Sequence, residues 1–172
     1  MLKLTALLTC AAIACSGNNI CSIPERPACN APSAGIQTQQ PAPEATPISA
    51  YAQEVVRLVN IERAHAGLAP LKLDTALSAA AQVRAGEIDI SFSHTRPNGG
   101  SSFSVLKEMG ITYRAVGENI AKGSPTPQRV VQGWMNSAGH RANILNKNFT
   151  TIGVGVHEDA AGVMHWAQLF MA

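Results

Sequence analysis

Apolar residues recur at three- and four-residue spacing over much of positions 49–145, a pattern typical of amphipathic helices. Helix-capping residues and left-handed stops divide this stretch into segments: Asp74 and Thr126 are good N-caps, Pro127 suits a first helical turn, and Gly67 and Gly110 are natural stops. Helices are therefore predicted over 49–66, from Asp74 to about Asp89, from Ser101 or Ser102 to Met109, from Thr126 through Trp134, and over 138–145.

The end of the chain changes to a strand pattern. Segments 150–156 and 163–171 are rich in β-branched and aromatic residues, and the intervening 158–162 suits a hairpin loop. On the second strand, His165 and Gln168 are predicted to face opposite ways. Helices first and antiparallel strands last indicate an α+β fold, a three-layer αβα sandwich with a mainly antiparallel central sheet.

The first 14 residues predict an export signal of the lipoprotein type. Lys3 precedes an apolar run of ten residues, 4–13, which is too short to span a bilayer as a helix. The run Ala12-Ile13-Ala14-Cys15-Ser16 resembles the lipobox of bacterial lipoproteins, in which the cysteine is acylated. We therefore expect a protein exported to the cell envelope and anchored to the membrane, on its periplasmic or extracellular face, by lipidated Cys15. The alternative is an ordinary thiol in a signal that another peptidase removes.

Residues 15–48 are predicted to be a disordered tether, since proline, glutamine and alanine abound there and bulky apolar residues are almost absent. Residues 49–172 then form the folded domain. All four cysteines lie at or before Cys29, so no disulfide can staple that domain; pairing of Cys21 with Cys29 is left open.

Composition limits the function. The 172 residues, 46% hydrophobic and 14% charged, suffice for one domain with a real core plus extensions. A formal net charge of +2 excludes a polyanion binder that works by bulk charge, so no nucleic-acid partner is expected. The five histidines are the only side chains whose ordinary charge changes near neutral pH, so site chemistry is expected around them.

Three phrases in the domain resemble one family, and they occur in that family's order. They are Ser-Phe-Ser-His-Thr-Arg-Pro-Asn-Gly at 91–99, Gly-Glu-Asn-Ile at 117–120, and Trp-Met-Asn-Ser-Ala-Gly-His-Arg-Ala-Asn-Ile-Leu at 134–145. The family is the CAP superfamily of cysteine-rich secretory, antigen 5 and plant pathogenesis-related proteins, in its bacterial branch with an SCP-like domain. The resemblance covers about residues 51–172.

The resemblance implies an αβα sandwich with a large open cleft that holds two histidines and two acidic residues. By motif, His94, Glu118 and His140 match three of the four, and Asn119 adjoins them. The second acidic position falls at Ser137, which leaves no paired carboxylates for acid and base chemistry.

Two imidazoles and one carboxylate are ligands that Zn²⁺ accepts, with a fourth position left for water. His94 and His140, with Glu118, are therefore candidate zinc ligands. If Ser137 is an N-cap, His140 occupies the third helical position, where the helix dipole favours a neutral ring. The metal-free alternative has both histidines lining a wet cleft and hydrogen-bonded to Glu118.

Three functions follow. The first is a module whose cleft binds an extended ligand, a lipid, peptide or cell-wall fragment, with or without a divalent metal. The second is a metal-dependent hydrolase of the peptidase type that uses His94, Glu118 and His140, with Glu118 as the candidate catalytic residue. The third is a non-catalytic surface interaction or defence protein. The first is preferred, because a Glu118 that binds metal leaves no carboxylate as general base.

Overall fold

The structure is a computed structural model that describes residues 49–172, so the predicted signal, tether and lipidation site at Cys15 lie outside the described residues. Within 49–172, no helix is long and apolar enough to cross a membrane. In chain order the elements are α1 (Ala50–His65), β1 (Lys72–Leu73), α2 (Thr75–Ile90), α3 (Ser104–Glu108), β2 (Val116–Lys122), α4 (Pro127–Asn136), α5 (Ala138–Ile144), β3 (Thr151–Glu158) and β4 (Met164–Met171).

The four strands form one mixed sheet in the order β1-β3-β4-β2. The two predicted strands, β3 and β4, pair antiparallel, and β2 joins β4 antiparallel, but β1 runs parallel to β3. The α+β class is confirmed, whereas the prediction of a mainly antiparallel sheet is wrong. The physical reason is the connector after α1, whose Lys72 and Asp74 amides donate to the carbonyls of Thr150 and Ile152.

The edge strand β2 has no counterpart in the predicted elements. Its sequence, Val-Gly-Glu-Asn-Ile-Ala-Lys, contains glycine and polar residues that disfavour strands. Seven consecutive residues nevertheless pair with β4, from Val116 opposite Met171 to Lys122 opposite His165. Tertiary pairing has therefore overridden local propensity.

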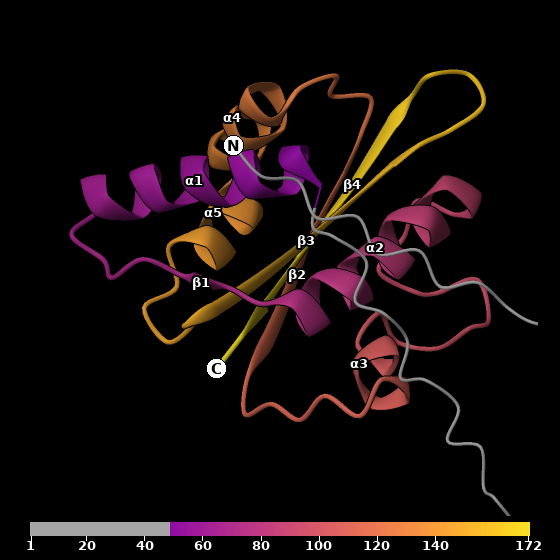
Figure 1. The fold of residues 1–172 in the computed structure, drawn as a ribbon, viewed down its shortest axis with the longest axis horizontal. Coiled ribbons are helices and arrows are strands. Elements are labelled where there is room, and N and C mark those ends of the chain that lie inside the picture. The colour runs from indigo at the N-terminus through magenta and orange to yellow at the C-terminus, as the bar shows by residue number, and fades with distance from the viewer. Residues whose placement is uncertain (1–48) are drawn as a thin grey trace, which may run out of the picture. The chain divides into compact units, whose positions relative to one another are not determined.

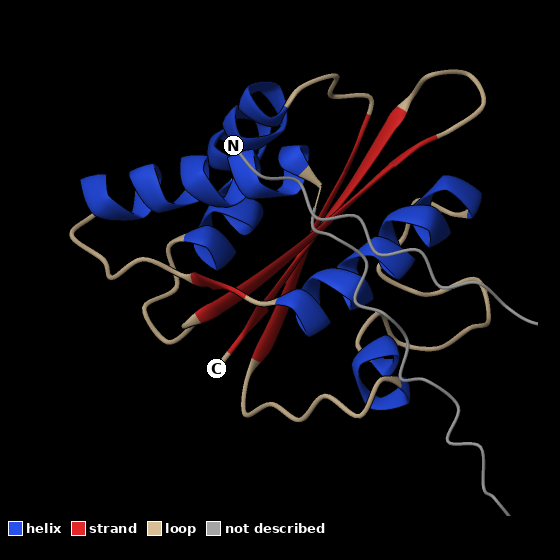
Figure 2. Ribbon diagram, in the orientation of Figure 1, coloured by secondary structure: helices blue, strands red, loops and turns tan. Residues whose placement is uncertain are grey.

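Helices lie on both faces of the sheet (Figures 1 and 2), with α1, α4 and α5 on one side and α2 and α3 on the other. Alternate residues of β4 supply both apolar clusters. Trp166 and Phe170 pack into the cluster that includes residues of α1 and α4, and Leu169 packs with residues of α2 and α3. The sheet thus has no solvated face at its centre, which explains why seven of the eight residues of β4 are buried.

Most helix ends follow the predicted signals. The side chains of Asp74 and Thr126 cap α2 and α4, and Gly67 and Gly110 adopt the left-handed conformation with φ of 69°. The start of α3 differs, because the helix begins at Ser104 with no side-chain cap. Ser101 instead accepts a hydrogen bond from the Phe103 amide in the preceding loop, so its hydroxyl is used before the helix starts.

A buried arginine connects α1 to the end of α5. The guanidinium of Arg63 donates to the carbonyls of Ala69, Ile144 and Asn146. Burial lowers the pKa of Arg63, but these carbonyls satisfy its donors. The contact fixes the helix that carries His140.

Helix α2 lies directly against β3 at two glycines. A Cβ added to Gly155 would lie 2.2 Å from the carbonyl carbon of Ala81, and one added to Gly153 would lie 2.3 Å from that of Leu77. Because the obstructing atoms belong to the helix backbone, neither position can accept a side chain without moving α2.

We expect Gly155→Ala to lower the free energy of unfolding by about 3 kcal/mol, because the added methyl group forces the helix off the sheet. Gly86→Ala, on α2 but with open space around it, is the matched control and should raise stability by about 0.5–1 kcal/mol. Urea unfolding followed by circular dichroism measures both changes. Equal stability of Gly155→Ala and the unmodified protein would contradict the close packing.

Candidate functional site

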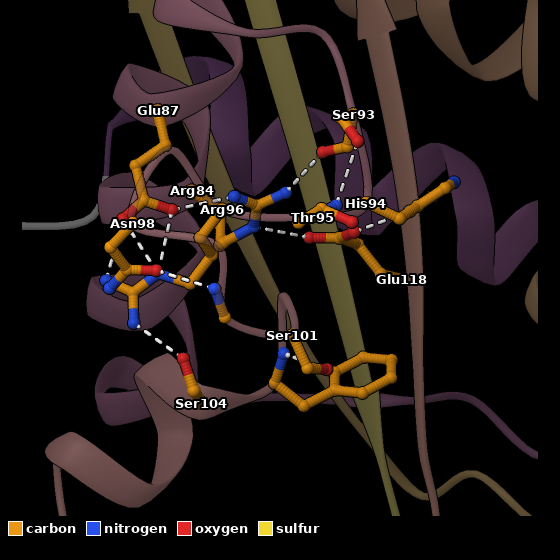
Figure 3. A network of polar contacts seen from close by, with 12 residues as sticks. Arg84, Glu87, Ser93, His94, Thr95, Arg96, Asn98, Ser101, Ser104 and Glu118 are labelled. Atoms are coloured by element: carbon orange, nitrogen blue, oxygen red, sulfur yellow. Dashed lines mark hydrogen bonds and ion pairs between the residues drawn. The ribbon is translucent and has the colours of Figure 1, made fainter.

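The candidate site begins with Glu118, a carboxylate buried on β2 with 1% of its side chain exposed. One oxygen, Oε1, accepts a hydrogen bond of 2.7 Å from Arg84 Nε, and the other, Oε2, lies 2.6 Å from His94 Nδ1 (Figure 3). Arg84 comes from α2, and His94 from the loop between α2 and α3. The structure therefore brings two of the predicted site residues into direct contact.

The buried guanidinium of Arg84 belongs to a larger charge network. It also donates to Glu87 Oε2 at 2.6 Å and to the Ser93 carbonyl at 2.8 Å, and Arg96 binds the same Glu87 carboxylate. Burial acts to lower the pKa of Arg84, but the bonds to Glu118 and Glu87 outweigh it and leave the pKa raised. The network thereby holds the loop that carries His94 against α2.

This arrangement sets which nitrogen carries the proton in a neutral His94 ring. An ionised carboxylate only accepts hydrogen bonds, so the proton of a neutral His94 ring sits on Nδ1 and the lone pair sits on Nε2. The side chain is 59% exposed, which leaves Nε2 accessible from solvent. A carboxylate behind a histidine in this way orients the ring and raises its basicity as a ligand.

His140 reaches the same region from α5, on the other face of the sheet. Its backbone carbonyl accepts a 3.1 Å hydrogen bond from Asn119, and Asn143 donates to the Glu118 carbonyl and to the Asn119 side chain. Asn119 itself is fully buried, where it holds α5 against β2. The side chains of neighbouring residues on β2 therefore position one histidine each: Glu118 holds His94, and Asn119 holds the helix of His140.

The pKa of His140 is lowered, first by burial and second by the nearby charge of His94. The sequence predicted a neutral ring from the helix dipole; the direction agrees, whereas the structure attributes the shift to burial and to the other imidazole. At neutral pH His140 is an uncharged imidazole.

Ser137 lies between α4 and α5 and has the backbone conformation of an N-cap, but its side chain makes no capping hydrogen bond. Ser137 is therefore the N-cap residue of α5, as predicted, but its hydroxyl does not take part in the cap. The first turn of α5 is instead closed by the backbone, where the Arg141 amide donates to the Ser137 carbonyl at 2.8 Å.

Three surface hollows, of about 610, 520 and 400 Å³, lie elsewhere. The largest is lined by the loop before β2 and the end of the chain, including Tyr113 and Ala172. None of these three is lined by His94, Glu118 or His140.

Sequence reasoning missed Arg84, Glu87 and Asn143 as parts of the site. Arg84 had a detectable signal, because it falls on the buried stripe of α2 with Leu77, Ala81 and Ile88. A charged residue on an apolar stripe is almost never fully buried without a partner. Nothing in the sequence indicated that Glu118 is the ion-pair partner of Arg84.

Comparison with known proteins identifies the family. Residues 56–170 match the family model of CAP, the cysteine-rich secretory protein family. The chain is 44% identical over 146 residues to YkwD, an uncharacterized protein of Bacillus subtilis; the match covers 84% of this chain and 56% of YkwD. The chain therefore spans only about half the length of that relative.

Solved structures show the same fold. An extracellular protein containing a SCP domain from Bacillus anthracis matches with a TM-score of 0.65 and 32% identity, over 70% of this chain and 40% of that one. An outer surface protein from Borrelia burgdorferi matches with a TM-score of 0.63 over 69% of this chain and 90% of that one; its 21% identity supports the fold alone. Together, the family match over most of the domain and the bacterial relatives show that this chain belongs to the bacterial branch of the CAP superfamily.

Proposed function

We propose that this protein is an exported CAP protein that binds an extended ligand, a lipid, peptide or cell-wall fragment, beside its edge strand β2. The observation that carries the proposal is the pair of imidazoles held around β2. His94 is oriented by a buried carboxylate with its Nε2 open to solvent, and His140 lies on α5, which Asn119 of the same strand holds in place. Two imidazoles that are held from the two faces of one accessible edge strand suit a binding site.

A divalent metal such as Zn²⁺ fits the same pair. His94 Nε2 and a nitrogen of His140 are the donors that would hold it, and bound Zn²⁺ would act as a Lewis acid toward an oxygen of the ligand. Glu118 contributes differently, because Arg84 and His94 already contact its two oxygens. In this proposal Glu118 orients the ring of His94, which binds the metal, and does not itself bind the metal.

The same contacts favour binding over hydrolysis. A metal-dependent hydrolase needs a base that can take a proton from water, and the Glu118 carboxylate is buried between an arginine and a histidine. Ser137 stands where the family resemblance places a second acidic residue. We therefore place the hydrolase second, and a surface protein that uses the scaffold alone third.

We also propose export and anchoring. The B. anthracis neighbour is described as extracellular and the B. burgdorferi neighbour as an outer surface protein. For this chain, the signal-like residues 1–14, lipidation of Cys15 and a tether over 15–48 would hold the domain at the cell envelope.

The full chain, purified from its membrane, is expected to carry a small molecule that depends on both histidines. Organic extraction followed by mass spectrometry should detect it in the unmodified protein and in His65→Ala, whose histidine is exposed at the end of α1. The His94→Ala/His140→Ala double variant should lose at least about nine-tenths of it. Equal recovery from the double variant would refute ligand binding at this edge.

Zinc binding should depend on the same pair. We expect calorimetric titration of the metal-stripped protein, with its cysteines alkylated, to show a class of Zn²⁺ site that is lost in His94→Ala/His140→Ala and retained in His65→Ala; Zn²⁺ that the double variant still binds belongs to another site. Glu118→Gln should weaken this class by about 10- to 100-fold, because the ring of His94 loses its orienting carboxylate. An unchanged titration in the double variant would exclude the metal at this position.

Mass spectrometry of the membrane-extracted protein should show a mature chain that starts at Cys15 and carries acyl groups. Cys15→Ser should abolish the acylation and release the protein from membranes, since a lipid anchor requires that sulfur. Cys21→Ser is the matched control and should remain acylated. An unmodified N-terminus at another residue would contradict lipidation.

A further inference from the structure

A second group of ligand-type side chains lies at the far end of β4, near the turn between β3 and β4. It consists of Asp89 in the last turn of α2, His157 on β3, Asp159 in the turn, and His165 on β4. We call these four residues the hairpin cluster. His157 and His165 are directly opposite each other in the antiparallel register, so their side chains share the face that α2 covers.

The cluster converges on one nitrogen. His165 Nε2 lies 3.1 Å from Asp159 Oδ2 and 3.3 Å from Asp89 Oδ1, and His157 Nε2 lies 3.5 Å from the other oxygen of Asp89. One ligand atom each from Asp89, Asp159 and His165 lies within 4.8 Å of the others. Two carboxylates and two imidazoles are a common ligand set for Zn²⁺.

His165 is completely buried, and its polar contacts concentrate on this point. Its Nδ1 has no hydrogen-bond partner among the described residues, whereas its Nε2 faces the two carboxylates. A neutral imidazole carries one N–H and one lone pair. Nε2 therefore either donates a proton toward both carboxylates or directs its lone pair at a cation held between them.

The carboxylate of Asp159 is oriented so that it could bind such a cation. Its Oδ1 accepts hydrogen bonds of 2.9 Å from the amides of Ala161 and Val163, which fixes the group and leaves Oδ2 directed at His165. Asp89 and His157 are half-buried and accessible from solvent, which provides an entry path.

We propose that the hairpin cluster is a divalent metal site suited to Zn²⁺, with Nε2 of His165 and one oxygen each of Asp89 and Asp159 as ligands. Tetrahedral Zn²⁺ with bonds near 2.0–2.1 Å places its ligand atoms about 3.3 Å apart, close to the two distances measured from His165. His157 is the candidate for the fourth position. Lys122 is opposite His165 on β2, but it is exposed, and no ion pair joins it to the carboxylates of the cluster among the described residues.

This site is separate from the His94 and His140 pair. Glu118 is opposite Leu169 in the β2–β4 register, and His165 is four residues away along β4, or about 13 Å. A metal here would tie the end of α2 to the β3–β4 turn. Its role would be structural, in a domain that contains no cysteine between residues 49 and 172.

The test uses the full chain with His94→Ala/His140→Ala as background and with its cysteines alkylated, so that the first site and the thiols cannot bind metal. Titration with zinc chloride should show one equivalent bound, and Co²⁺ should give the visible absorption of a tetrahedral site. Adding Asp89→Asn should weaken Zn²⁺ binding at least about 10-fold and remove the absorption. His157→Gln is the second variant, and both positions are accessible enough to tolerate replacement.

Glu158→Gln, an exposed carboxylate adjacent to the cluster, is the matched control and should bind Zn²⁺ like the background. Saturating Zn²⁺ should also raise the melting temperature of the background and of Glu158→Gln, and should leave that of Asp89→Asn unchanged. The proposal is overturned if the background binds no Zn²⁺, or if Asp89→Asn and His157→Gln bind it as tightly as the background does. In either case the four groups form a hydrogen-bond network.

Discussion

The buried ion pair between Arg84 and Glu118 is the interaction on which the candidate site depends. Two charges removed from water are costly unless each is compensated, and removing one partner of such a pair typically costs about 3–5 kcal/mol. Here the compensation is extensive, because Arg84 also binds Glu87 and a backbone carbonyl, and Glu118 also binds His94. The pair connects α2 to the edge strand and sets the orientation of the accessible histidine.

The helices and the terminal hairpin could be predicted because their signals are local. Asp74 and Thr126 cap helices through their own side chains, and β3 and β4 follow each other in the chain with strand-forming sequences. The edge strand could not be predicted in the same way. Glu118 and Asn119 disfavour a strand until Arg84 from α2 and Asn143 from α5 satisfy them, and these partners are 34 and 24 residues distant in sequence.

For the candidate site, too, some features could be predicted from the sequence and others could not. Motif resemblance identified His94, Glu118 and His140, and the structure shows Glu118 in contact with His94 and the helix of His140 bound to β2 through Asn119. Resemblance did not indicate the burial or the hydrogen-bond partners of each side chain. Both depend on contacts from other elements, such as the guanidinium beside Glu118 and the burial of His140, which no spacing along the chain reveals.

The glycines at 153 and 155 have a consequence for how the molecule moves. With no side chain between the helix and β3, α2 can neither roll about its axis nor slide by a residue without a collision between main chains. Arg84 and Asp89 both project from this one helix, toward opposite ends of the sheet. The contact with Glu118 and the contact with His165 are therefore both made from a helix whose position on the sheet is set by main-chain packing.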